Sequence, residues 1–211
     1  MTKLKYGENP HQEATVEFAA TNDLLALGNF LLKGKSLESY EELPVSSTLL
    51  TDLDRALETL VRICLISRAL ALRASHVAVV VKHGNPCGAA IAENSQRAFV
   101  NAMRGDARAA FGGLILTNFE VTGSIIVKAK RFTRQPFMLT TLGAPSISDD
   151  VAQNLKRRVG ETNLLVNQEL RRSGSVGVAP GMRHRFLRGA RIMMQPSTFL
   201  PLFTTKYLVA G

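Results

Sequence analysis

The chain has 211 residues, of which 45% are hydrophobic and 20% are charged, and it carries a formal net charge of +9. No apolar run approaches the roughly 20 residues that a membrane helix needs, which argues against a membrane partner. With two cysteines and no apolar segment behind the basic N-terminus, we expect a cytoplasmic protein without a disulfide framework, folded as one domain over residues 1–211.

The first long periodic segment predicts a helix over residues 51–73. Apolar residues recur there at steps of three and four, and Asp52 and Asp54 lie near the positive end of the helix dipole. A β-branched run over 77–81 then predicts a strand that is apolar on both faces and covered by helices on both sides. We expect a turn to follow this strand and a second helix to run over residues 89–103.

The second half of the chain continues this alternation. We expect strands over 114–117 and 137–140, a helix over 148–158 capped by Ser148, a loop over 172–190 and a last strand over 192–194. Alternating helices and strands predict an α/β fold, a three-layer α-β-α sandwich with the sheet between two helical layers.

The excess of positive over negative charge lies entirely in the second half of the chain. Residues 1–105 carry 11 basic and 11 acidic side chains, whereas 106–211 carry 15 basic and 6 acidic ones. An anionic partner would suit this half, and a solvated surface is the alternative. Aromatic residues are only 6% and do not alternate with the charges, so we do not expect nucleic acid as the partner.

Lys82 and His83 stand at the end of the strand predicted over 77–81. Open α/β sheets bind their ligands at the carboxyl ends of strands, and an imidazole placed there can act as a general base. Gly84 and Gly88 let the backbone approach a ligand, and amides that open a helix near Ala89 would favour an anion. These residues predict a site for an anion or a developing oxyanion. A solvated strand end without function is the alternative.

Three segments of the chain carry a family resemblance. They read LKYGENPHQ from residue 4, KHGNPCG from residue 82 and AFGG from residue 110. In this order they resemble signature segments of the aminoimidazole-carboxamide ribonucleotide (AICAR) transformylase domain of the bifunctional purine biosynthesis enzymes. Weaker correspondences extend the resemblance over nearly the whole chain. The resemblance implies a cytidine-deaminase-like fold, of which the family domain holds two copies and this chain only the first.

The resemblance also implies a reaction and its residues. The family moves a formyl group from 10-formyltetrahydrofolate to an amine of the nucleotide, and no metal takes part. Carried over, His83 takes the proton of the attacking amine, and Lys82 stabilises the formyl oxygen or protonates the leaving folate nitrogen. The implied substrate-binding residues are Lys5, Tyr6, Gly7, Asn85, Pro86, Cys87 and Gly88. The implied folate-binding residues are Phe111, Gly112 and Gly113.

Two departures from the family affect these expectations. The family commonly has Arg where this chain has Lys5, and a lysine lacks the bidentate fork that suits phosphate, which predicts weaker phosphate binding or a different acceptor. The second copy of the family fold is missing. We expect a homodimer to replace it, because symmetric pairs are the commonest oligomers; a separate chain that supplies the other half is the alternative.

Two other functions compete with formyl transfer. Zinc deaminases share the implied fold, but here Pro86 and Cys87 are followed by no second cysteine and His83 by no glutamate two residues on, which argues against a catalytic zinc. A non-catalytic protein that binds folate or a nucleotide, or regulates a purine enzyme, remains the alternative to an enzyme.

Overall fold

The structure, a computed structural model, describes residues 1–132, 137–155, 161–175 and 183–194. Its centre is a seven-stranded sheet in the order β4-β3-β10-β9-β8-β6-β7. The strands are β3 (Leu31–Leu32), β4 (Lys35–Ser36), β6 (His76–Lys82), β7 (Asn85–Ala92), β8 (Gly113–Thr117), β9 (Leu139–Ala144) and β10 (Asn163–Val166). Strands β8, β9 and β10 are parallel, whereas β6 is antiparallel to both of its neighbours, β7 and β8.

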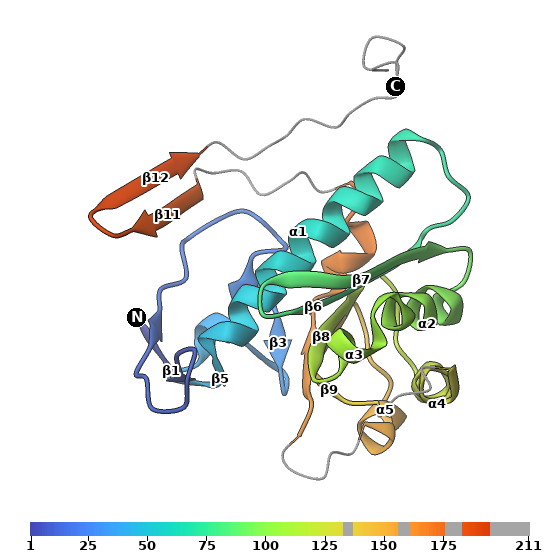
Figure 1. Ribbon diagram of the computed structural model, residues 1–211, viewed down its shortest axis with the longest axis horizontal. Coiled ribbons are helices and arrows are strands. Elements are labelled where there is room, and N and C mark those ends of the chain that lie inside the picture. Colours follow the sequence, from blue (N-terminus) through green and yellow to red (C-terminus); the bar gives the residue numbers. More distant parts are fainter. Residues whose placement is uncertain (133–136, 156–160, 176–182, 195–211) are drawn as a thin grey trace.

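Helices cover both faces of this sheet (Figure 1). They are α1 (Ser47–Ala69), α2 (Ser95–Gly105), α3 (Ala107–Ala110), α4 (Gly123–Phe132) and α5 (Asp150–Asn154). Alternate residues of β6 point into two separate cores: Val79 packs with the α1 residues, and Val80 packs with those of α2 and α4. The structure thus confirms a mixed α/β fold with a sheet between helices.

A smaller sheet lies beside α1. Its order is β2-β1-β5, with β1 (Thr2–Tyr6), β2 (Thr15–Val16) and β5 (Glu42–Ser46). Strand β5 leads directly into α1, where the Ser46 hydroxyl accepts a hydrogen bond from the Leu49 amide at 3.3 Å and caps the helix. Three 3-10 helices and a separate hairpin complete the described chain: η1 (Leu27–Asn29), η2 (Leu37–Ser39), η3 (Gln168–Arg172), β11 (Arg183–Leu187) and β12 (Ala190–Met194).

The first predicted helix and the strand after it are confirmed, with shifted ends. Helix α1 begins at Ser47 rather than at residue 51, because Ser46 supplies the cap, and it ends at Ala69. Ala71 has a positive φ of 48°, which a continuing helix could not accommodate.

The predicted helix over 89–103 is wrong in its first half. Residues 85–92 form β7, and the helix begins only at Ser95, capped by the side chain of Asn94. A tight turn folds β7 back onto β6, and α2 lies against the hairpin so closely that a Cβ at Gly88 would stand 2.0 Å from the carbonyl oxygen of Ala102. The small residues of β7 are therefore held as a strand by β6, with which they pair, and by α2, which packs against them.

Three predictions for the second half need correction, and two hold. The strands predicted over 114–117 and 192–194 lie within β8 and β12. The strand predicted over 137–140 instead begins at Leu139, and the loop predicted over 172–190 contains β11. The helix predicted over 148–158 is the short α5, with residues 156–160 outside the described part. The Ser148 hydroxyl bonds to the Asp150 carboxylate and does not cap the helix.

Candidate active site

Lys82 and His83 lie at the turn of the β6–β7 hairpin. Lys82 pairs with Asn85 across the turn, and the two residues between them, His83 and Gly84, have positive φ angles of 53° and 74°. Type I′ hairpin turns require positive φ at both central positions. The His83 side chain is exposed at this tip.

A buried carboxylate holds the turn in place. Asp52, in the second turn of α1, accepts hydrogen bonds from the Gly84 amide at 2.6 Å and the His83 amide at 3.3 Å. The Gly84 amide, which belongs to the loop that was expected to bind an anion, thus already binds the Asp52 carboxylate of the protein itself. The expectation that a helix opens near Ala89 is wrong, because this residue lies within β7.

The second and third sequence segments meet at Lys82. Its ammonium donates a hydrogen bond to the carbonyl oxygen of Phe111 at 2.6 Å. Gly113 begins β8 beside it, and a Cβ there would lie 2.9 Å from the carbonyl oxygen of Val81. Gly112 has a φ of 75°, and its amide donates a hydrogen bond to the carbonyl oxygen of Met138 at 2.9 Å. Residues implied in formyl transfer and in folate binding are therefore neighbours, and the residue Phe111 is 39% exposed.

The first segment lies at the start of α1. Tyr6 pairs with Ser46, the cap of that helix, and the Lys5 ammonium stands 5.8 Å from the centre of the Tyr6 ring. The Gly7 amide donates to the carbonyl oxygen of Gln12 at 2.8 Å and closes the loop of this segment. Asp52 lies six residues after Ser46, or about 9 Å along the helix axis. The start of α1 thus connects the first segment to the turn that carries Lys82 and His83.

The four remaining residues implied in substrate binding follow one another at the start of β7, and the first two are more exposed than the last two. Asn85 and Pro86 are exposed, and the Asn85 side chain donates to the His83 carbonyl oxygen at 3.0 Å. Cys87 is half-buried, with its thiol 3.6 Å from the Val80 carbonyl oxygen, and this burial raises the pKa of the thiol. Gly88 packs directly against α2, so of these four residues only Asn85 and Pro86 are exposed, beside His83 at the hairpin tip.

The strand directions place these residues at the other edge of the sheet from the one expected. Because β6 is antiparallel to β8, Lys82 at its carboxyl end lies beside Gly113, at the amino ends of the parallel strands. The expectation that Lys82 and His83 face the carboxyl edge of a parallel sheet is therefore wrong. The physical reason is the hairpin, which reverses the chain before β8 is reached.

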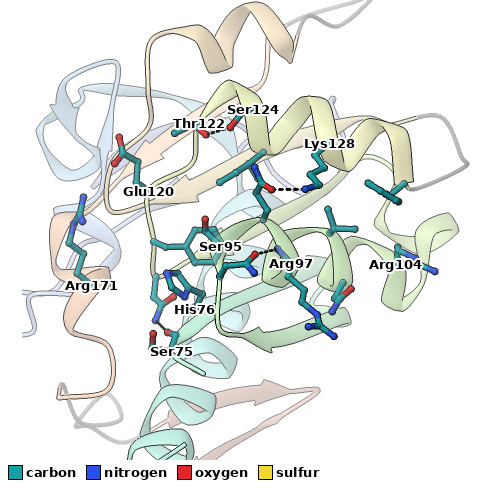
Figure 2. A pocket seen from close by; sticks show the side chains of 18 residues that line it. Ser75, His76, Ser95, Arg97, Arg104, Glu120, Thr122, Ser124, Lys128 and Arg171 are labelled. Atoms are coloured by element: carbon teal, nitrogen blue, oxygen red, sulfur yellow. Dashed lines mark hydrogen bonds between the residues drawn. The ribbon is translucent and has the colours of Figure 1, made fainter. Parts of the chain in front are cut away.

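A cavity of about 960 Å³ lies at the opposite, carboxyl edge, and sequence analysis missed it. It is lined by residues before β6, at the start of α2, after β8 and along α4, including His76, Arg97, Asn118 and Lys128 (Figure 2). Lys82 and His83 do not line it. The polar residues after β7 and β8 were its signal, but only the sheet order brings these two loops together.

The described part of the chain shows neither a metal-binding cluster nor a membrane-spanning helix. Within it, no three His, Cys, Asp or Glu side chains gather in a way that could hold a metal ion. None of its helices combines the length and the apolar character of a membrane span.

Residues 1–195 match the family described as AICARFT/IMPCHase bienzyme, and the chain belongs to this family. The resemblance seen in the sequence is thus confirmed.

The relatives that the chain matches include bifunctional purine biosynthesis proteins named PurH. The protein of Prochlorococcus marinus strain MIT 9312 is 31% identical over 153 residues, which are 72% of this chain and 27% of the relative. That of strain MIT 9515 is 32% identical over 168 residues, or 80% and 30%. That of Polynucleobacter asymbioticus is 32% identical over 148 residues, or 70% and 25%. The chain spans about a quarter to a third of the length of these relatives.

Proposed function

We propose that the chain takes part in purine biosynthesis as a folate-dependent formyltransferase, moving the formyl group of 10-formyltetrahydrofolate to the amine of AICAR or a related acceptor. Membership of the AICARFT/IMPCHase family supports the proposal. The observation that carries it is the 2.6 Å hydrogen bond from the Lys82 ammonium to the Phe111 carbonyl oxygen, because it joins the segment implied in chemistry to the one implied in folate binding.

The proposed reaction uses the two side chains at the turn in sequence. The amine nitrogen of the acceptor attacks the formyl carbon, and the His83 imidazole takes the proton that this nitrogen loses. The Lys82 ammonium has two N–H groups beyond the one given to Phe111, and these stabilise the negative charge that develops on the formyl oxygen. The bond from the formyl carbon to folate N10 then breaks, and the proton passes to N10, which leaves tetrahydrofolate and the formylated amine.

The positions of the other implied residues support the same proposal. Phe111, whose carbonyl oxygen accepts the hydrogen bond from Lys82, is an exposed aromatic residue that we propose contacts the folate together with Gly112 and Gly113. The Lys5 and Tyr6 side chains lie at the start of α1, and we propose that they hold the nucleotide and its phosphate. We also propose that two copies of the chain pair to complete the site.

A formyl-transfer assay with AICAR and 10-formyltetrahydrofolate tests the proposal. His83→Asn is the informative variant, because Asn followed by Gly favours a type I′ turn, so the hairpin is kept while the base is removed. Lys82→Met removes the ammonium and keeps most of the aliphatic stem. We expect each variant to lower kcat by about a hundredfold or more, the usual contribution of one such group.

Lys33→Met is the matched control, since Lys33 is exposed and pairs with Glu161 away from the turn. It should leave turnover unchanged. Absence of turnover in the unaltered chain, with nucleotide or folate binding retained, would support the non-catalytic binding protein instead. Sedimentation with and without folate tests the homodimer, and a strict monomer under both conditions would contradict that part of the proposal.

A further inference from the structure

The cavity at the carboxyl edge of the sheet is large enough for a metabolite. Its volume of about 960 Å³ is near the upper end of the roughly 300–1,000 Å³ typical of small-molecule sites. It opens between the loop after β8 and the parallel helices α2 and α4, which pack against each other (Figure 2). The residues proposed for formyl transfer stand at the opposite edge, so this cavity is separate from them.

The charge around the cavity is predominantly positive. Arg97 and Arg104 reach it from α2, Lys128 from α4 and Arg171 from η3, whereas Glu120 is the one acidic residue among the described residues that line it. Arg97 and Arg104 are seven residues apart, which is about two helical turns, so both lie on the same side of α2. A concave surface with this excess of cations concentrates anions.

The two helices add to the same effect. Helix α2, of 11 residues, and helix α4, of 10, both begin at this edge of the sheet, so the positive ends of both dipoles meet there. Hydroxyl groups stand at both starts: Ser95 opens α2, and Thr122 and Ser124, whose hydroxyl oxygens are 2.9 Å apart, flank the start of α4. Cations, hydroxyls and helix starts together are the groups that proteins use to bind phosphate.

An apolar and aromatic wall lies beside these polar groups. Phe119, Val100 and Ile125 contribute to the lining, and the His76 ring stands 5.6 Å from the Phe119 ring. The Nδ1 atom of His76 is buried and has no hydrogen-bond partner within the part of the chain that the structure describes. A planar group next to a phosphate would match a wall of this kind beside a cationic rim.

We propose that this cavity is a second ligand site, which binds a phosphorylated small molecule of nucleotide size. The phosphate lies at the starts of α2 and α4, held by Arg97 and Lys128 and by the hydroxyls of Ser95 and Ser124. The planar part of the ligand lies against His76 and Phe119. Lys128 is already oriented for this role, since its ammonium donates to the Gln96 side chain at 2.8 Å.

Calorimetric titration of the chain with adenosine 5′-monophosphate, adenosine and inorganic phosphate tests the proposal. We expect saturable binding of the monophosphate, at least tenfold weaker binding of adenosine, and weak but measurable binding of phosphate. Arg97→Gln and Lys128→Gln should each weaken binding of the monophosphate by about tenfold. Glutamine has nearly the same helix propensity as arginine and lysine, so these variants keep the helices intact.

Two controls distinguish this site from the proposed formyl-transfer site. Arg55→Gln removes a positive charge from α1, on the other face of the sheet, and should leave the affinity unchanged. Lys33→Met, which removes an exposed lysine that does not line the cavity, should also leave it unchanged. If Lys5→Met abolished binding of the monophosphate while Arg97→Gln did not, the nucleotide would lie at the other site and the proposal would be overturned. Absence of saturable binding by both the monophosphate and phosphate would overturn it as well.

Discussion

Replacing Asp52 by Ala should loosen the hairpin turn that carries Lys82 and His83. Asp52 is only 7% exposed, and its carboxylate accepts hydrogen bonds from the Gly84 amide at 2.6 Å and the His83 amide at 3.3 Å. Removing the carboxylate leaves the half-buried Gly84 amide without this acceptor. The turn then keeps its own positive φ angles but loses its attachment to α1.

The expected loss of stability follows from these two hydrogen bonds. A hydrogen bond to a charged group contributes about 1.5–3 kcal/mol, and the longer bond from His83 adds little. We therefore expect Asp52→Ala to lower the free energy of unfolding by about 2–3 kcal/mol. Asp52→Asn keeps one acceptor oxygen for Gly84 and should cost roughly 1 kcal/mol.

Urea unfolding followed by far-UV circular dichroism measures this loss. With a slope of about 2–3 kcal/mol per molar urea, the Asp52→Ala midpoint should fall by about 1 M. Glu42→Ala is the control, because this exposed carboxylate stands 3.9 Å from Lys3 and such surface pairs contribute little. An Asp52→Ala midpoint within about 0.2 M of the unaltered chain would refute the reasoning. If formyl transfer is detected, Asp52→Ala should also reduce kcat.

Three further predictions concern other parts of the fold. Gly88→Ala should destabilise the chain by about 3 kcal/mol in the same unfolding assay, because the added Cβ would stand 2.0 Å from the carbonyl oxygen of Ala102. An unchanged urea midpoint would show that β7 and α2 separate easily. Iodoacetamide at pH 8 should label the half-buried Cys87 before Cys64. Burial raises the pKa of Cys64 to about 11, which leaves only about one molecule in a thousand as thiolate at that pH. Mass spectrometry that found Cys64 labelled first would contradict this prediction. Hydrogen bonds from the Ser148 hydroxyl and the Gly123 amide lower the pKa of Asp150 below its ordinary 3.8. These bonds therefore stabilise the fold above pH 3.8, and the stabilisation is lost as the pH falls through the lowered pKa. Asp150→Asn should therefore reduce the decline of the urea midpoint between pH 5 and pH 2.5, and an equally steep decline would contradict the assignment.

Local chemistry was sufficient to predict several elements. The three- and four-residue steps of Leu53, Ala56 and Leu60 predicted α1, and its start was misplaced only because the capping Ser46 lies outside the periodic pattern. The β-branched run of β6 predicted a strand buried on both faces, because neither face offers a polar side chain to water. The family resemblance likewise rested on short motifs, and these can be read without any fold.

The candidate site needed the tertiary structure for its surroundings. The sequence placed Lys82 and His83 together because they are neighbours in the chain, whereas the contact between Lys82 and Phe111 spans 29 residues and depends on the pairing of β6 with β8. The hydrogen bonds from the turn to Asp52 depend on the packing of α1 against the hairpin. No local pattern encodes such contacts.

By itself, the sequence determined the family, the α/β class, the main helix and the buried strand, because each is a property of neighbouring residues or of helical and strand periodicity. Only the tertiary structure decided that residues 85–92 form a strand, since their small side chains suit a strand beneath α2 and have no strong preference of their own. That strand sets the direction of β6 relative to β8. It thereby decided which edge of the sheet carries Lys82 and His83, and which edge carries the cationic cavity.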